Sequence, residues 1–142
     1  MRKTTLYFTM FYALFALLFT ACSKDDSKSL TENKTFNPPS WILGKWLMNR
    51  NVTGSEIGFE FKANDFCYIT AGTTTCFNSV LGTYDGTNVK TDITEEKSDN
   101  HYKVSVTIQG TTTKYHFVKV SNTEIQETVT DPNGNATYYK SN

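Results

Sequence analysis

Apolar and polar residues alternate through most of the chain after residue 40. The alternation is clearest in Ile57–Lys62 and His101–Ile108, and each segment is typical of a strand with one buried face. Turn-forming residues interrupt the pattern at short intervals, at Asn51–Gly54, Tyr84–Gly86, Ser121–Asn122 and Asp131–Gly134. This spacing predicts an all-β fold of about eight antiparallel strands joined in sequence, an up-and-down meander that closes into a small β-barrel.

The segment Cys67–Cys76 has the pattern of a β-hairpin with Ala71-Gly72 as its two-residue turn. In that register Thr70 lies opposite Thr73, and Cys67 lies opposite Cys76 in a non-hydrogen-bonded pair. Such pairs bring Cα atoms to about 4.5 Å, which is close enough for a disulfide. The hairpin therefore predicts a Cys67–Cys76 disulfide, and two buried free thiols are the alternative. A metal site is not expected, because the cysteines lack metal-ligand spacing and only two histidines, His101 and His116, are present.

A second hairpin is expected around Gly110-Thr111, because glycine at the first turn position suits a type II′ turn. The expected register pairs apolar residues on one face: Ile108 with Thr113, Val106 with Tyr115, and Val104 with Phe117. The opposite face is polar and carries Lys103, Ser105, Thr107, Lys114 and His116.

Catalysis is not predicted, although the expected register brings Ser105 opposite His116. A nucleophile and a base need an acid and an oxyanion hole as well, and no such groups are evident near these two mid-strand residues. Glu95 and Glu96 lie in the polar stretch 94–100 and are interpreted as loop charges. We therefore expect a non-enzymatic protein without a cofactor.

One acid is expected inside the barrel. Glu127 shares a strand face with Ile125 and Val129, so it points inward if that face is the buried one. A polar group among aromatic rings is how many cavities orient a ligand. Candidate ligand-binding residues are therefore Glu127, Tyr115, Phe117, Phe59 and Phe61. Together with Trp46, the aromatic rings among these candidates would also fill much of so small a barrel, which leaves little room for a large ligand.

The N-terminus has the pattern of an export signal. Arg2 and Lys3 precede an uncharged segment, Thr4–Ala21, that ends on small residues before Cys22. The segment is also close to the length of a transmembrane helix, about 20 residues, but its threonines and tyrosines favour a cleaved signal peptide.

The ending Thr20-Ala21-Cys22 resembles the bacterial lipobox, in which a peptidase cuts before a diacylated cysteine. The resemblance implies that Cys22 is lipidated and anchors the protein in a membrane; an ordinary signal peptide would leave Cys22 unmodified or in a disulfide. The following Ser23–Asp26 resembles the acidic export signal of Bacteroidetes lipoproteins, which implies a place on the outer membrane, at the cell surface.

The predicted organisation is a signal peptide (1–21), a flexible tether (22–40) and one β-barrel domain (41–142). The tether is rich in Ser, Lys, Asp, Thr and Asn and ends in Asn37–Ser40. Cleavage would remove Arg2 and Lys3 but no acid, which leaves 12 Lys and Arg against 14 Asp and Glu. This balance provides no basic surface for nucleic acid, so no nucleic-acid partner is expected.

The motif Gly44-Lys45-Trp46 resembles the Gly-x-Trp that opens lipocalins. Together with Phe59–Phe61 and Gly82–Tyr84 it is similar to small lipocalin-like lipoproteins of Bacteroidetes. The resemblance implies that Trp46 closes one barrel end and that the protein binds a small hydrophobic molecule or a glycan fragment. Two alternatives stay open. Cys76–Asn78 with Gly82–Tyr84 resembles a META domain, and the barrel could be a protein-interaction module, either an accessory subunit of an envelope complex or an immunity protein against a toxin.

Overall fold

The computed structural model describes residues 35–48, 54–128 and 135–141, all of which belong to one compact unit, residues 33–142. The expected signal peptide, Cys22 and most of the tether lie outside these residues. The described elements, in chain order, are η2 (Ser40–Ile42), β1 (Gly44–Leu47), β2 (Gly58–Lys62), β3 (Asp65–Thr70), β4 (Thr73–Cys76), α2 (Phe77–Gly82), β5 (Thr91–Lys97), β6 (His101–Ile108), β7 (Thr111–Lys119), β8 (Glu124–Glu127) and β9 (Ala136–Ser141). No helix in this part of the chain has the length and apolarity that crossing a membrane requires.

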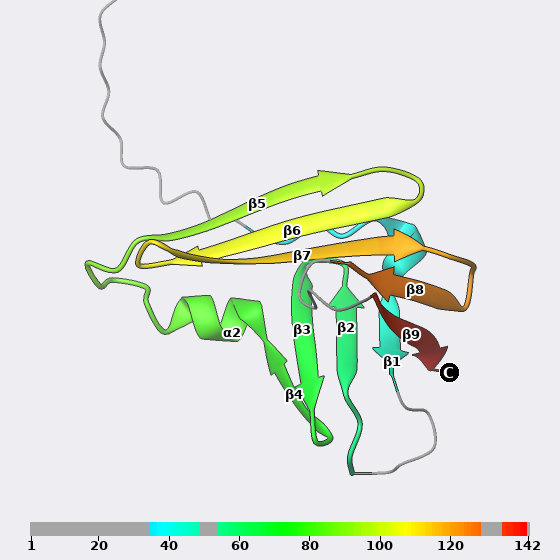
Figure 1. The fold of residues 1–142 in the computed structure, drawn as a ribbon. Coiled ribbons are helices and arrows are strands. Elements are labelled where there is room, and N and C mark those ends of the chain that lie inside the picture. Colours follow the sequence, from blue (N-terminus) through cyan, green and yellow to red (C-terminus); the bar gives the residue numbers. More distant parts are fainter. Residues whose placement is uncertain (1–34, 49–53, 129–134, 142) are drawn as a thin grey trace, which may run out of the picture. The chain divides into compact units, whose positions relative to one another are not determined.

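The described strands form one nine-stranded antiparallel sheet in the order β4-β3-β2-β1-β9-β8-β7-β6-β5 (Figure 1). Except for β4 and β5, strands that follow each other in sequence are neighbours in the sheet, and the first strand pairs with the last, so the predicted all-β, up-and-down architecture is confirmed. The sheet has nine strands where about eight were expected, and it curls into a half-barrel. Its two edges, β4 and β5, are separated in sequence by α2, and we call the gap between them the open seam.

The predicted cysteine hairpin is confirmed. Ala71 and Gly72 form the turn between β3 and β4 with φ of 49° and 74°, the two positive values of a type I′ turn. Cys67 pairs with Cys76 across the ladder, and a disulfide joins their sulfur atoms.

The predicted register of the β6–β7 hairpin is wrong by two residues. The turn is Gln109-Gly110, with φ of 51° and 81°, so it is a type I′ turn that begins one residue earlier than expected. Ile108 therefore pairs with Thr111, and Val104 with Tyr115. A shift of two residues keeps each side chain on its predicted face, because strand side chains alternate with a period of two.

Aromatic rings from opposite walls of the half-barrel meet in its interior. Phe59 and Phe61 of β2 each lie 5.0 Å from Phe117 of β7, measured between ring centroids. Phe66 of β3 lies 5.0 Å from Tyr115 of β7. Since β2 and β7 are separated by three strands in the sheet order, these contacts cross the interior, which side chains fill at this level as the sequence suggested.

Trp46 is part of this core, with 0% of its surface exposed. Its indole N–H donates to the carbonyl of Ile42 in η2 at 2.6 Å, and the ammonium of Lys140 lies 5.2 Å from the centre of its ring. The buried position predicted for Trp46 is confirmed, while its role as the closure of one barrel end remains a prediction.

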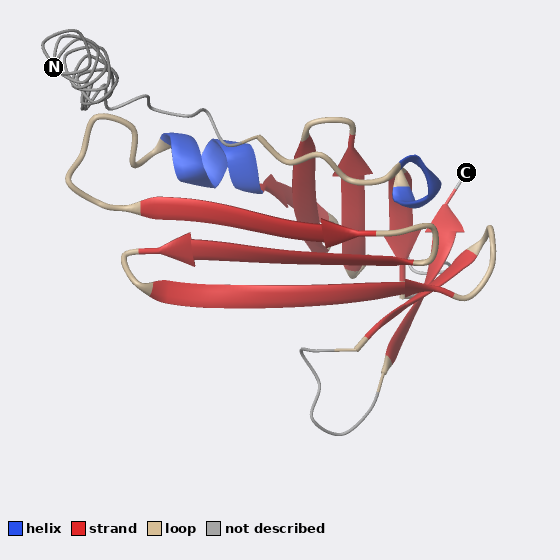
Figure 2. Cartoon of the chain, turned by 90° about the horizontal axis from the view of Figure 1, so that it is seen from above, coloured by secondary structure: helices blue, strands red, loops and turns tan. Residues whose placement is uncertain are grey.

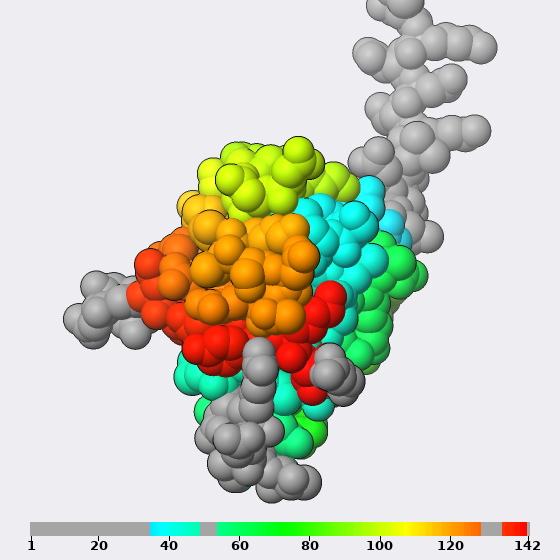
Figure 3. Space-filling view, turned by 90° about the vertical axis from the view of Figure 1, so that its right-hand side faces the viewer, coloured from blue at the N-terminus to red at the C-terminus, as the bar shows by residue number. Residues whose placement is uncertain are grey.

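The residues before β1 lie along the open seam. Phe36 is 1% exposed, and its ring contacts Phe66 of β3 and Phe77 of α2 at 6.2 and 6.0 Å. The next residue, Asn37, donates its backbone N–H to both carboxylate oxygens of Glu95 in β5, at 3.0 and 3.1 Å. We call residues 35–41 the strap, because it contacts both sides of the seam. In Figure 2 the backbone that leads to η2 runs past α2 and along β5, and in Figure 3 the cyan surface near residue 40 lies next to the yellow-green surface of β5. Most of the strap falls in the range assigned to the tether from sequence.

Glu95 is not the loop charge that the sequence suggested. It belongs to β5 and accepts hydrogen bonds from the hydroxyl of Tyr102 and from the strap. On the same strand Lys97 donates to the carbonyl of Asn37 at 2.8 Å, and the Trp41 indole donates to the carbonyl of Ser98 at 2.8 Å. These polar contacts hold the strap against an otherwise unpaired sheet edge.

Candidate functional site

Glu127 faces the interior of the half-barrel, as predicted. It ends β8, pairs with Phe117 of β7 and Ala136 of β9, and is 4% exposed. Ile125, two residues earlier, is also buried, which fits the alternation of this short strand. Sequence pattern alone therefore located a carboxylate inside the fold.

The two oxygens of this carboxylate have different surroundings. Oε2 accepts a hydrogen bond from the Tyr138 hydroxyl at 3.1 Å, whereas the buried Oε1 has no hydrogen-bond partner among the described residues. Burial, followed by the charge of Glu127, raises the pKa of Tyr138, so this phenol remains a proton donor. A buried acceptor without a partner is costly, and native proteins seldom leave one without a reason.

The carboxylate borders a cluster of aromatic rings, because Tyr138 donates to it and Phe117 pairs with Glu127 across the ladder. Phe59 lies 5.8 Å from Tyr115, 5.0 Å from Phe117 and 5.0 Å from Tyr138. The pKa of Tyr115 is raised by burial and then by the negative charge of Glu127. We call the cluster of Glu127, Tyr115, Phe117, Phe59 and Tyr138 the Glu127 site.

The structure brings together all five ligand-binding candidates named from sequence, since Phe61 contacts both Phe59 and Phe117. Sequence reasoning missed Tyr138 and Tyr68. Tyr138 and Tyr139 are adjacent in a strand, so one of them had to face inward, and this signal could have identified a tyrosine at the site.

Tyr68 provides the exposed part of the same inner face. It pairs with Phe59 across β2 and β3, lies 5.9 Å from the ring of Phe77, and is 37% exposed. Its proximity also contributes to the raised pKa of Tyr115. The inner aromatic surface therefore reaches solvent at Tyr68.

The interior carries no buried counter-charge in the part of the chain that the structure describes. Glu127 is the one charged residue among the buried side chains there, and the remaining buried residues are apolar or aromatic. A carboxylate in such surroundings is most stable when a hydrogen-bond donor or a cation reaches it.

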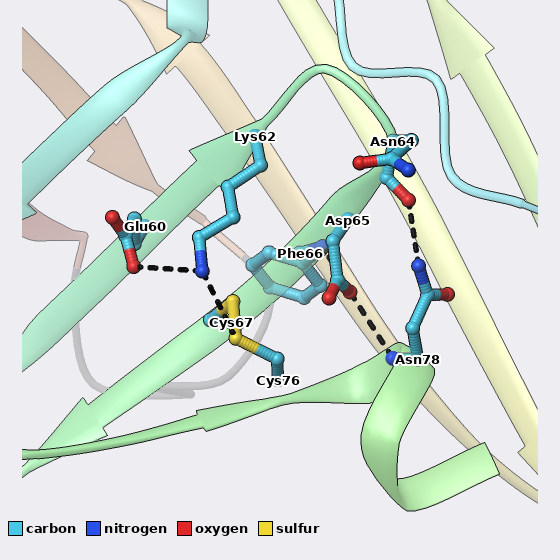
Figure 4. The surroundings of a disulfide bond; sticks show 8 residues. All are labelled: Glu60, Lys62, Asn64, Asp65, Phe66, Cys67, Cys76 and Asn78. Carbon is cyan, nitrogen blue, oxygen red and sulfur yellow. Dashed lines mark hydrogen bonds and ion pairs between the residues drawn. A yellow bond between two sulfur atoms is a disulfide. The ribbon is translucent and has the colours of Figure 1, made fainter. Parts of the chain in front are cut away.

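The disulfide surroundings form a structural site (Figure 4). Asp65 Oδ1 accepts from the backbone N–H of Asn78 at 3.1 Å, near the start of α2, and the ammonium of Lys62 lies 3.6 Å from Cys76 Sγ. Asp65, Cys67 and Cys76 place metal-ligand atoms close together. The two sulfur atoms are bonded to each other, however, and so do not offer thiolates to a metal.

The polar face of β5–β7 lacks the arrangement considered for catalysis. Ser105 pairs with Lys114, not with His116, because of the register shift. His116 Nδ1 instead lies 2.7 Å from the Thr128 hydroxyl, and burial lowers the pKa of His116. Glu96, which also belongs to β5 and not to a loop, pairs with Lys103 at 3.0 Å.

No protein-family model matches this chain, and no curated protein or solved structure matches it either. The lipocalin-like and lipoprotein assignments therefore stay expectations drawn from sequence motifs. The Glu127 site is the described feature that bears most directly on function.

Proposed function

We propose that the protein is a lipid-anchored lipoprotein of a bacterial outer membrane whose lipocalin-like barrel binds a small, largely apolar molecule at the Glu127 site. The observation that carries the binding proposal is the buried Oε1 of Glu127, which has no partner among the described residues and lies in an aromatic surround. Binding sites commonly combine an apolar lining with one polar group that orients the ligand.

The packing limits the size and the route of this ligand. Rings from β2 and β7 touch across the interior, so the ligand has to be small or has to displace rings as it enters. Tyr68 lies at the solvent-accessible end of the inner aromatic surface, and the rings of Tyr68 and Tyr115 both contact Phe77. Entry past Tyr68 is therefore part of the proposal.

Two equally exposed tyrosines provide a matched test of the binding face. Tyr68 and Tyr139 are both 37% exposed, but Tyr68 pairs with the buried Phe59, whereas Tyr139 pairs with Glu124 and follows the inward-facing Tyr138. With the neutral fluorescent probe N-phenyl-1-naphthylamine, Tyr68→Ala is expected to weaken binding by about fivefold through loss of aromatic contact. Tyr139→Ala should leave the probe affinity unchanged. Equal affinities for wild type and Tyr68→Ala, or no saturable binding at all, would contradict the proposal.

The anchor at Cys22 lies outside the described residues and is tested separately. Cys22→Ser is expected to abolish palmitate labelling and to move the protein from the membrane fraction to the soluble fraction, because the acyl chains attach at this residue. Labelling and fractionation of both forms in a bacterial host check the expectation. Lack of label on the wild type, together with membrane retention of the variant, would show that lipidation at Cys22 is wrong.

An interaction module is the second candidate, and exposed apolar residues on the outer face favour it. Val120 is 49% exposed and bonds through its N–H to the carbonyl of Glu124, which in turn pairs with the exposed Tyr139. If a protein partner docks on this face, Tyr139→Ala is expected to weaken binding of that partner and Tyr68→Ala to leave it unchanged. The same pair of variants therefore separates the two functions.

A further inference from the structure

We propose that the Glu127 site selects the ammonium group of a small organic amine over neutral or anionic molecules of the same shape. This inference rests on the proposed ligand-binding function and names the chemical class of the ligand.

The charge balance of the interior is the first argument. Glu127 is the sole charged residue among the buried side chains of residues 35–48, 54–128 and 135–141, so no buried lysine or arginine neutralises it there. Its one described hydrogen bond comes from the neutral hydroxyl of Tyr138. An unneutralised carboxylate in an apolar interior is strongly disfavoured, and an incoming cation relieves that cost.

The carboxylate of Glu127 also carries an acceptor that the described residues leave unused. Oε1 of Glu127 is sealed from solvent and accepts no hydrogen bond from the described residues. An ammonium group would supply an N–H donor to Oε1 and a positive charge in a single contact. Charge-assisted hydrogen bonds of this kind are roughly twice as strong as neutral ones. An alcohol would supply only the donor, and a carboxylate would add a repulsive charge.

The aromatic lining is the third argument. Phe59 meets Tyr115, Phe117 and Tyr138 at interplanar angles of 76°, 75° and 62°, so the rings of this cluster expose both edges and faces within it. Ring faces attract cations within about 6 Å of their centroids. The raised pKa of Tyr115 and Tyr138 keeps both phenols neutral, so neither is an anion that competes with Glu127 for the ammonium group. Rings of this size also suit an amine that carries an aromatic or similarly compact apolar body.

Three probes that share a phenyl body test this inference by isothermal titration calorimetry on the full chain. They are 2-phenylethylamine, 2-phenylethanol and 3-phenylpropionate at neutral pH. For the wild type we expect the amine to bind about tenfold more tightly than the alcohol, because it adds a charge-assisted bond, and the carboxylate to bind most weakly. In Glu127→Gln, which keeps an acceptor for Tyr138 but removes the charge, amine and alcohol should bind within about twofold of each other.

Two further variants control for folding and for nonspecific effects. Glu95→Gln changes another glutamate that accepts from a tyrosine hydroxyl, but at the strap, so it should retain the amine preference. Tyr139→Phe removes the hydroxyl of the neighbouring tyrosine on the opposite face of β9, away from the Glu127 site, and should also retain that preference. Near-ultraviolet circular dichroism of each variant, matching the wild type, establishes that the core is folded.

The outcomes separate the ligand class from the binding function. Equal affinity of the wild type for amine and alcohol, or an amine preference that survives in Glu127→Gln, would overturn the amine proposal. If N-phenyl-1-naphthylamine binds but 2-phenylethylamine does not, the ligand class is wrong and the binding function stands. If neither probe binds, both proposals fail.

Discussion

Replacement of Trp46 by alanine is expected to lower the free energy of unfolding by about 3–5 kcal/mol, the usual cost of truncating a buried large aromatic side chain. Trp46 is fully buried, its indole donates to Ile42, and Lys140 lies over its ring, so the substitution removes packing and leaves the Ile42 carbonyl without this donor. A domain of this size has about 5–15 kcal/mol of stability in total. Urea and thermal unfolding of the two forms measure the loss.

Trp41 is the matched control, because it is the other tryptophan in the chain. It is half-buried, packs against the edge of the core and donates its indole N–H to Ser98. Trp41→Ala should therefore cost clearly less than Trp46→Ala. A melting temperature that Trp46→Ala leaves within about a degree of the wild type would show that Trp46 is not a core residue, since even 1 kcal/mol shifts such a domain by about 4–8 °C.

Removal of the Phe36 side chain from the strap is expected to have the next largest effect on stability. Phe36→Ala should lower the free energy of unfolding by about 3 kcal/mol, because the substitution removes a nearly fully buried ring together with its contacts to Phe66 and Phe77. The loss also uncovers the open seam between β4 and β5, where the half-barrel has no strand pairing. Chemical denaturation of the full chain provides the measurement.

Thr35→Ala is the control for this prediction, since Thr35 is the exposed neighbour of Phe36 in the strap. Substitutions at exposed positions usually change stability by less than about 0.5 kcal/mol. If Phe36→Ala and Thr35→Ala give the same unfolding midpoint, the strap does not stabilise the barrel, and this part of the chain behaves as the tether that its composition suggested.

Local features of the fold could be predicted from sequence. The prediction of the cysteine hairpin was correct because Ala71-Gly72 specifies a two-residue turn, and this turn fixes which residues of the two strands lie opposite each other. Glu127 was placed inside from the alternation of its own strand. The β6–β7 hairpin shows the limit of the same reasoning: Gln109 adopts a positive φ that the pattern did not indicate, so the turn moved by one residue while the faces stayed correct.

Features that depend on distant parts of the chain could not be predicted. The strap combines two prolines and three short polar residues with Phe36 and Trp41, and only its contacts with Glu95, Phe66 and Phe77 show that it belongs to the barrel. The open seam between β4 and β5 lies in the middle of the chain, and no local pattern in the sequence marks it, because it depends on how the whole sheet pairs. The unsatisfied oxygen of Glu127 likewise depends on which side chains of β7 and β9 surround it.

The central claim is that a small molecule binds on the inner aromatic face, beside Glu127. Fluorine NMR of the full chain labelled with 3-fluorotyrosine tests it most directly, because tyrosines lie on both faces of the described sheet. Assignment is made by single Tyr→Phe substitutions. On titration with N-phenyl-1-naphthylamine, the resonances of Tyr68, Tyr115 and Tyr138 are expected to shift in a saturable way while that of Tyr139 does not. A shift of Tyr139 with the three inner tyrosines unmoved would contradict the claim and would place the binding surface on the outside of the barrel.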